Sequence, residues 1–257
     1  MTTLPPGFTH ELRTHLRSHN PPVDETTGVP ILDFNKFCCG AHGFAALIET
    51  QVDGDAPQVT LFDTGPDVTS LVRNIDSMHV PVEKIERVII SHWHSDHTGG
   101  LLSFLDLRDS EAHACVVDVH PSRPLLRGIA PGPQFNKIIC ALPRDPSFDD
   151  IVEHGGILEQ HATGHTVADD TVWVSGEVPR VTEFETGILG GMRWTEDGTW
   201  KLEPHIMDER YAVIDVAGKG LVILSACSHS GIVNVVKDAV ATFQRPIYMV
   251  RIVFPGR

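Results

Sequence analysis

The segment Ser91–Gly100, with the sequence SHWHSDHTGG, places three histidines and one aspartate within six positions. It follows the apolar run Val88–Ile90, which has the length and composition of a buried strand. The residues from Thr98 to Leu107 predict a helix directly after it. The polar side chains are therefore expected on a short loop between the end of a strand and the start of a helix.

Histidine nitrogens and aspartate oxygens are the ligands that Zn²⁺ takes in sites that keep one position open for water. His92 and His94 are two residues apart, so their rings can point the same way and hold one ion. Asp96 and His97 lie just beyond and can serve a second ion. With 15 histidines in the chain, stray pairs are expected on its surface, but this spacing behind a buried strand is not. The pattern predicts a metal site.

The motif His92–His97 resembles the His-x-His-x-Asp-His signature of the metallo-β-lactamase superfamily. The segment Val59–Gly65 (VTLFDTG) is similar to the strand and Asp-Thr-Gly turn that precede the metal loop in that family. The resemblance implies that Asp63 supports the loop rather than binding metal. It also implies the α/β fold of the superfamily, an αββα sandwich of two mixed β-sheets with flanking helices.

Two later segments resemble one branch of the superfamily. These are Trp173–Arg180 (WVSGEVPR) and Leu224–Asn234 (LSACSHSGIVN). The branch includes the archaeal dihydropterin ribofuranosylaminobenzene phosphate synthases and many hydrolase-like proteins. The likeness runs from about Gly43 to Tyr248, and it names no substrate.

The sequence gives weaker evidence for the remaining metal ligands. His229 follows an apolar strand on a loop that leads into a helix, as in the main motif, so it is the preferred third histidine. His165, in a Gly-His-Thr segment, is the competing choice. Asp208 could bridge two ions, support the site from outside or lie in a surface turn. Cys227 could be a soft ligand, although a small buried hydrophobic residue is the commoner role. The expected metal ligands are His92, His94, Asp96, His97 and His229.

The resemblance implies a zinc-dependent hydrolase that uses a metal-bound hydroxide, with one or two zinc ions and with iron or manganese left open. Asp96 is the expected catalytic residue, which orients the nucleophile and handles its proton. Glu177 and Arg180 are the expected substrate-binding residues, because arginine can grip a phosphate or carboxylate with two hydrogen bonds. A structural ion pair is the alternative for these two residues.

The carboxyl end departs from the family pattern. In relatives, the strand corresponding to Pro246–Val250 continues into a segment whose histidine is the last metal ligand, whereas here the sequence RIVFPGR follows. We therefore expect a sandwich that lacks its last strand and helix and exposes an apolar edge. The alternative function is a catalytically impaired truncated or splice form with partial metal binding. His165 or His205 is the expected substitute ligand if two ions are held.

Composition limits the remaining possibilities. A chain of 257 residues, 41% of them hydrophobic, suits one metallo-β-lactamase-like domain over residues 31–257 after a loosely structured arm at 1–30. A net charge of −14 argues against nucleic-acid partners and favours a small-molecule substrate. The sequence has no apolar run long enough to span a membrane and no secretory signal, and its five cysteines suit a reducing compartment, so a cytoplasmic location is expected.

Strands are predicted at 44–50, 59–62, 88–90, 114–119, 172–174, 212–216, 221–224 and 246–250, and helices at 67–78, 98–107 and 231–243.

Overall fold

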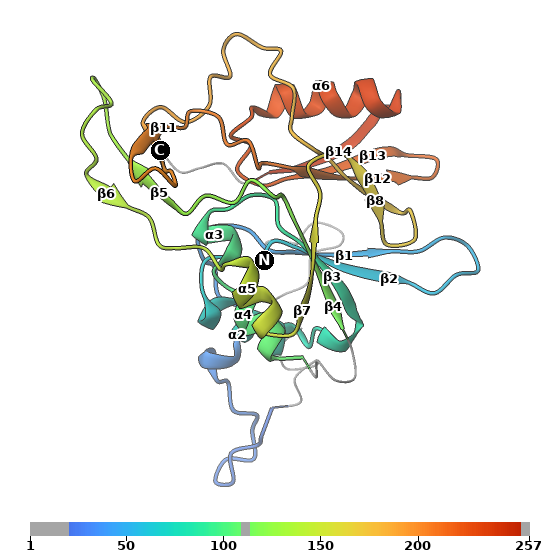
Figure 1. Ribbon diagram of the computed structural model, residues 1–257. Helices are drawn as coiled ribbons and strands as arrows, with labels where there is room; N and C mark the ends of the chain where they lie inside the picture. The colour runs from blue at the N-terminus through green and yellow to red at the C-terminus, as the bar shows by residue number, and fades with distance from the viewer. Residues whose placement is uncertain (1–20, 109–113, 253–257) are drawn as a thin grey trace, which may run out of the picture.

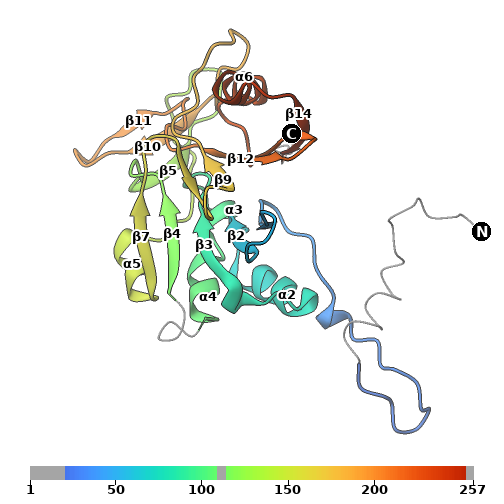
Figure 2. The same cartoon turned by 90° about the vertical axis from the view of Figure 1, so that its right-hand side faces the viewer.

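Two five-stranded sheets lie face to face, and helices cover the outer face of each one (Figure 1, Figure 2). The structure is a computed structural model that describes residues 21–108 and 114–252. The first sheet has the order β1-β2-β3-β4-β7, in which β1 is antiparallel to β2 and the other neighbours are parallel. Its strands are β1 (Ala46–Thr50), β2 (Gln58–Phe62), β3 (Ile85–Ile89), β4 (Cys115–Val119) and β7 (Gly156–Gln160).

The second sheet has the order β14-β13-β12-β9-β8, and only its β13–β14 pair is parallel. Its strands are β8 (His165–Val167), β9 (Val172–Val174), β12 (Tyr211–Val216), β13 (Gly220–Ser225) and β14 (Ile247–Ile252). A smaller antiparallel sheet has the order β11-β10-β5-β6. It comprises β5 (Leu126–Ile129), β6 (Cys140–Ala141), β10 (Gly191–Trp194) and β11 (Trp200–Leu202).

The helices complete the αββα arrangement that the resemblance implied. On the outer side of the first sheet lie α2, α3, α4 and α5, and α6 lies on the outer side of the second (Figure 1). The helices are α2 (Val68–Met78), α3 (Ser95–Thr98), α4 (Leu101–Asp106), α5 (Phe148–Glu153) and α6 (Ile232–Phe243), with short 3-10 turns η1 (Phe34–Lys36) and η2 (Val82–Lys84). None of the helices described is long and apolar enough to cross a membrane.

Side chains alternate between the two faces of each strand, and this alternation divides the core into two layers. Phe62 and Ile89 are fully buried in the cluster between the two sheets, whereas their neighbours Leu61 and Val88 pack in the cluster beneath the helices of the first sheet. Successive strand side chains point to opposite faces, so a wholly apolar run such as 88–90 can serve both layers. This explains why the run 88–90, at the end of the strand before the metal loop, is wholly hydrophobic.

The helix predicted over Thr98–Leu107 is divided in the structure. The short α3 begins at Ser95 and contains Asp96 and His97, and α4 begins only after Gly99 and Gly100. A Cβ at Gly99 would lie 2.0 Å from the Pro66 carbonyl oxygen. This close approach requires glycine, and it packs the turn after β2 against the metal loop.

Other expectations differ in detail or fall outside the described residues. The strand expected from Phe44 begins at Ala46, since Phe44 instead bonds to Asp96 and Gly65 through its backbone. Residues 1–20 are not described, and residues 21–30 form a turn with a bridge between Val23 and Pro30. The strand β14 lies at the edge of the second sheet, where it was expected. The small third sheet, β7, β8 and α5 were not predicted.

Candidate metal centre

Three imidazole nitrogens meet at one point between the sheets. His92 Nε2 lies 3.0 Å from His94 Nδ1, and His229 Nε2 lies 3.2 Å from each of these atoms. His92 follows β3, His94 caps the start of α3, and His229 lies on the loop from β13 to α6. Ligands about 2.0–2.1 Å from a tetrahedral zinc ion are separated by about 3.3 Å, so these spacings suit one ion.

Hydrogen bonding around His92 fixes where its lone pair points. The Ser91 hydroxyl donates to Asp63 Oδ2 at 2.7 Å and lies 2.9 Å from His92 Nδ1. Because the Ser91 proton is already given to Asp63, the Ser91 oxygen accepts from the Nδ1–H of His92. The other nitrogen, Nε2, is then left without a proton and faces the centre. Burial lowers the pKa of His92 well below its usual value, and nearby cationic groups add to this effect.

The other two histidines of the triad are also held neutral. Burial lowers the pKa of His94 well below the usual value, and the Arg127 charge lowers it further. Burial likewise lowers the pKa of His229, against the opposing influence of Glu209. In the neutral state, the facing nitrogens of His94 and His229 can present lone pairs as His92 Nε2 does, and three lone pairs directed at one point can bind a cation. The donor set therefore fits a divalent metal ion.

A second group of donors lies beside the triad. His97 Nε2 is 3.5 Å from Asp96 Oδ2 and 3.0 Å from Cys227 Sγ. The three residues form one group able to hold an ion, and Cys227 also belongs to a group with His92 and His229. Sequence reasoning favoured a packing role for Cys227, but the structure places its sulfur between the two groups of donors.

Asp63 and His97 form a buried pair that supports both donor groups. His97 Nδ1 lies 2.7 Å from Asp63 Oδ2, and both side chains are fully buried. Burial opposes the charged form of His97, but the Asp63 carboxylate and the hydrogen bonds around the ring raise the pKa of His97 to about 12. A cation bound here must displace the proton on Nε2. Asp63 also accepts from the backbone nitrogen of Ser91 at 2.7 Å, so it orients the loop as the resemblance implied.

Asp96 keeps its charge beside this pair. Burial raises the pKa of a carboxyl group, but the hydrogen bond and positive charge of His97, together with the influence of His94, outweigh it and lower the pKa of Asp96 to about 2. His42 Nε2 lies 3.3 Å from Asp96 Oδ2 on the outer side, a neighbour that sequence reasoning missed. A Cβ at Gly43 would lie 1.8 Å from the Asp96 carbonyl oxygen, so glycine alone lets this segment approach.

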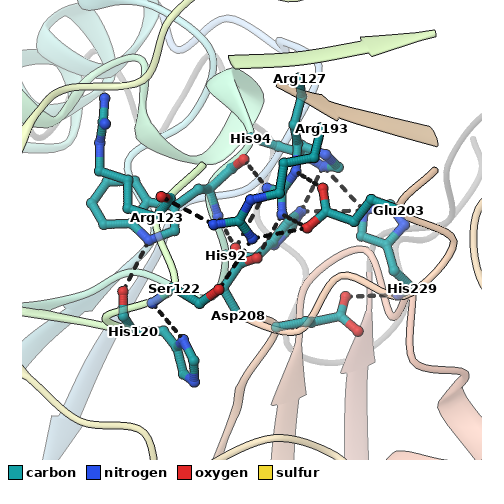
Figure 3. A network of polar contacts seen from close by, with 12 residues as sticks. His92, His94, His120, Ser122, Arg123, Arg127, Arg193, Glu203, Asp208 and His229 are labelled. Atoms are coloured by element: carbon teal, nitrogen blue, oxygen red, sulfur yellow. Dashed lines mark hydrogen bonds and ion pairs between the residues drawn. The ribbon is translucent and has the colours of Figure 1, made fainter. Parts of the chain in front are cut away.

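Asp208 supports the metal loop and is not part of either donor group. Its Oδ2 accepts from the backbone nitrogen of Trp93 at 2.7 Å, and its Oδ1 accepts from Arg127 at 2.6 Å. Arg127 also binds Glu203 and the carbonyl oxygen of Trp93, and Arg193 joins the same network through Glu203 (Figure 3). This buried network ties β5 and β10 of the small sheet to the loop that carries His92 and His94.

The two residues after Asp208 support other parts of the centre. Glu209 accepts from the backbone nitrogen of His229 at 2.7 Å and from the backbone and hydroxyl of Ser230. Arg210 donates to the Ile90 carbonyl oxygen at 2.7 Å and to Asp118 at 2.8 Å. All three side chains of the segment 208–210 are buried. One short segment before β12 therefore supports both loops that supply the triad.

His165 and His205 lie apart from the triad. His165 Nε2 is 2.7 Å from Asp118 Oδ2, and its ring stacks on His161 with centroids 3.8 Å apart. Asp118 is already bound by Arg87 and Arg210, which disfavour a cation there. His205 is exposed.

The two residues expected to bind substrate lie in different environments: Arg180 contacts the ligand loop, and Glu177 is exposed. Arg180 Nη1 donates to the His229 carbonyl oxygen at 3.1 Å, so this side chain contacts the ligand loop. Glu177 is exposed, and it acts on Arg180 electrostatically. The structure thus gives Arg180 a supporting contact at the centre.

Comparisons with known proteins agree with this geometry. The model of the metallo-beta-lactamase superfamily matches residues 44–182. The chain is 29% identical over 203 residues to a 7,8-dihydropterin-6-methyl-4-(beta-D-ribofuranosyl)-aminobenzene-5'-phosphate synthase of Methanocaldococcus jannaschii, which covers 77% of this chain and 65% of that protein. An uncharacterized protein of the same archaeon is 28% identical over 198 residues, 76% of this chain and 66% of its own length. The chain thus spans slightly less than two thirds of these curated relatives.

A solved structure shows the same fold. The crystal structure of Tm1679, a metal-dependent hydrolase of the beta-lactamase superfamily, matches with a TM-score of 0.58 at 18% identity. The match covers 82% of this chain and 75% of that one. The chain belongs to the metallo-β-lactamase superfamily. Its members usually bind metal ions, in agreement with the donor groups found here.

Proposed function

We propose that this protein is a metal-dependent hydrolase that acts on a small-molecule substrate at the centre formed by His92, His94 and His229. The observation that carries the proposal is the convergence of three neutral imidazole nitrogens within 3.0–3.2 Å of one another. The similarity to Tm1679, a metal-dependent hydrolase, supports the reaction class. The Methanocaldococcus jannaschii synthase belongs to a different reaction class, so it does not identify the substrate of this chain.

A divalent ion at such a centre supplies a water of lowered pKa and a positive charge that polarises the oxygen of the substrate. The triad would hold this ion, and Asp63 and Asp208 would keep the ligand loop in position. Asp96, His97 and Cys227 would hold a second ion. Zinc suits this mixture of imidazole, carboxylate and thiol donors, whereas manganese prefers oxygen ligands.

Asp96 is the proposed catalytic residue. Its carboxylate belongs to the second donor group and is the most exposed of the three side chains, at 22%. It would accept a hydrogen bond from the attacking water and orient it toward the substrate. It would then pass the proton taken from the water to the leaving group.

The test combines metal content with turnover. Purified protein is stripped with a chelator, reloaded with zinc, cobalt, iron or manganese, and measured by elemental analysis and against ester, lactone, phosphodiester and β-lactam probes. We expect metal-dependent hydrolysis of at least one probe class. Metal binding without turnover of any of these probes would contradict the proposed reaction.

A spectroscopic variant tests the donor set independently of turnover. Cobalt bound by the wild-type protein should show a thiolate charge-transfer band, and Cys227→Ser should abolish that band while the triad still binds cobalt. An unchanged spectrum would exclude Cys227 as a ligand.

A further inference from the structure

A cavity of about 550 Å³ opens beside the metal centre. It extends from Cys227 and His229 to the loop that joins β9 to β10, which passes beside the first turn of α6 (Figure 1). Its lining is mainly apolar, and the large apolar side chains are those of Phe184, Ile188, Ile232 and Ile252. A substrate whose reacting atom lies at the histidines must place part of its remaining structure in this cavity.

The start of α6 would ordinarily make this a site for an anion, because the first backbone N–H groups of a helix attract phosphate or carboxylate. Here the protein fills that position itself. Glu185 accepts from the backbone nitrogens of Val233 at 2.8 Å and Asn234 at 2.9 Å. A Cβ at Gly231 would lie 2.1 Å from Glu185 Cδ, so the carboxylate packs directly against the chain. No room is left at the helix start for a phosphate group.

Positive charge is also missing from the cavity wall. Within the part of the chain that the structure describes, no lysine or arginine lines it. Arg180 lies near the ligand loop, but it donates to the His229 carbonyl oxygen and faces three carboxylates, those of Glu177, Glu185 and Glu209. An anionic substrate group in this cavity would lose its hydration and meet the negative charge of Glu185.

We propose that this cavity binds an uncharged, apolar arm of the substrate, whose reacting group lies at the histidines. This inference rests on the proposed hydrolase function and specifies its substrate class, a neutral molecule with an apolar arm. Carboxylic esters, open-chain or cyclic, are the probes of this class. In their hydrolysis, water adds its oxygen to the ester carbonyl carbon, the bond from that carbon to the alkoxy oxygen breaks, and a proton passes to the departing oxygen. The products are a carboxylic acid and an alcohol, joined in one molecule when the ester is a lactone.

The test uses the zinc-loaded full chain and p-nitrophenyl esters from acetate to octanoate. Burial of one methylene group contributes about fourfold to binding when it is complete, so kcat/KM should rise about two- to fourfold per methylene until the cavity is filled. Bis(p-nitrophenyl) phosphate should be a poorer substrate than the hexanoate ester. Lactones with alkyl chains of the same lengths then distinguish cyclic from open-chain esters.

A matched pair of variants locates the effect. Phe184 and Leu189 are exposed apolar residues on the same loop, but only Phe184 lines the cavity. Phe184→Ala should lower kcat/KM for the octanoate ester about tenfold and leave the acetate ester within about twofold, while Leu189→Ala changes neither. Equal effects of both variants, or none, would overturn the assignment of the arm to this cavity.

A binding measurement separates this inference from the proposed reaction. Acetohydroxamate and octanohydroxamate share a metal-binding head and differ only in the tail, and calorimetry gives their affinities for zinc-loaded protein. Octanohydroxamate should bind at least tenfold more tightly, and Phe184→Ala should remove most of that difference. If no probe is hydrolysed but octanohydroxamate still binds more tightly than acetohydroxamate, the proposed hydrolase function is wrong and the assignment of the apolar arm to the cavity stands. If esters are hydrolysed without regard to chain length, or the phosphodiester is preferred, the apolar-arm inference is wrong.

Discussion

The backbone nitrogen of His229 donates to the carboxylate of Glu209 across 2.7 Å. The other carboxylate oxygen of Glu209 accepts from Ser230, so the loop after β13 is fixed to the short segment before β12. Because His229 is the member of the triad that comes from outside the main motif, this contact sets the position of the third nitrogen.

Glu209→Gln should weaken metal binding without removing any proposed ligand. An amide has one oxygen, so one N–H donor of the loop would face an NH₂ group instead of an acceptor. We expect a loss of about 10- to 100-fold in zinc affinity, measured by competition with a chromophoric chelator. Glu183→Gln, at an exposed position, is the control and should bind zinc normally. Wild-type affinity in Glu209→Gln would show that this contact does not position His229.

His229→Ala should remove the third nitrogen of the triad. Zinc stoichiometry at a low free-zinc concentration should fall by about one ion per chain, because a two-histidine position binds far more weakly. His165→Ala is the matched control, since His165 contacts Asp118 and lies apart from the triad. Elemental analysis after dialysis gives both values. A loss of zinc in His165→Ala instead would exchange the roles of the two histidines.

Asp96→Asn should retain the fold and lose most turnover. The amide neither carries negative charge nor accepts a proton, so kcat should fall about 10²- to 10⁴-fold against the best ester probe. Circular dichroism and thermal unfolding should change little, because the Asp96 side chain is partly exposed. Zinc content is measured in parallel. Turnover like that of the wild type would exclude Asp96 from the reaction.

Gly43→Ala should disturb the approach of its segment to Asp96, and Gly54→Ala provides a closely matched comparison. The two glycines have φ values of 92° and 90°, so the backbone strain of an alanine is similar in both. A Cβ at Gly43 would lie 1.8 Å from the Asp96 carbonyl oxygen, whereas a Cβ at Gly54 has no heavy atom within 4 Å. Urea unfolding should show Gly43→Ala to be less stable than Gly54→Ala by at least about 1–2 kcal/mol. Equal unfolding free energies would contradict a close approach at Gly43.

Acid should destabilise the protein partly through Asp118. Burial opposes its charged form, but hydrogen bonds from His165 and Arg210 lower the pKa of Asp118 from 3.8 to about 2. A carboxyl group with a lower pKa in the folded state stabilises that state above pH 4, and the contribution is lost as the pH falls from about 4 to 2. That contribution is on the order of 2 kcal/mol.

Asp118→Asn tests this contribution through the pH dependence of unfolding. The variant should be less stable at neutral pH, because it leaves Arg210 buried without its anionic partner. Its free energy of unfolding should then fall less than that of the wild type between pH 4 and pH 2, as measured by urea titration at each pH. Parallel curves for the two proteins would show that Asp118 does not contribute to the acid sensitivity.

The sequence alone determined the features that depend on neighbours in the chain. The apolar run 88–90 predicts a strand buried on both faces, and the spacing of His92, His94, Asp96 and His97 predicts donors grouped at its end. The observed β3 and α3 agree with that prediction. The predicted helix over residues 98–107 was too long. The close packing of Gly99 against Pro66 divides it, and nothing in the local sequence indicates that contact.

Tertiary structure decided which distant residues complete the centre. His229 is 137 positions from His92, and only the stacking of the second sheet on the first brings their nitrogens to 3.2 Å. The same stacking gives Asp208 a supporting role, although its sequence context suits a surface turn equally well. Whether a polar side chain binds metal, supports a loop or faces water depends on what lies opposite it after folding. The sequence specifies the donors along one loop, whereas the packing of two sheets selects their partners.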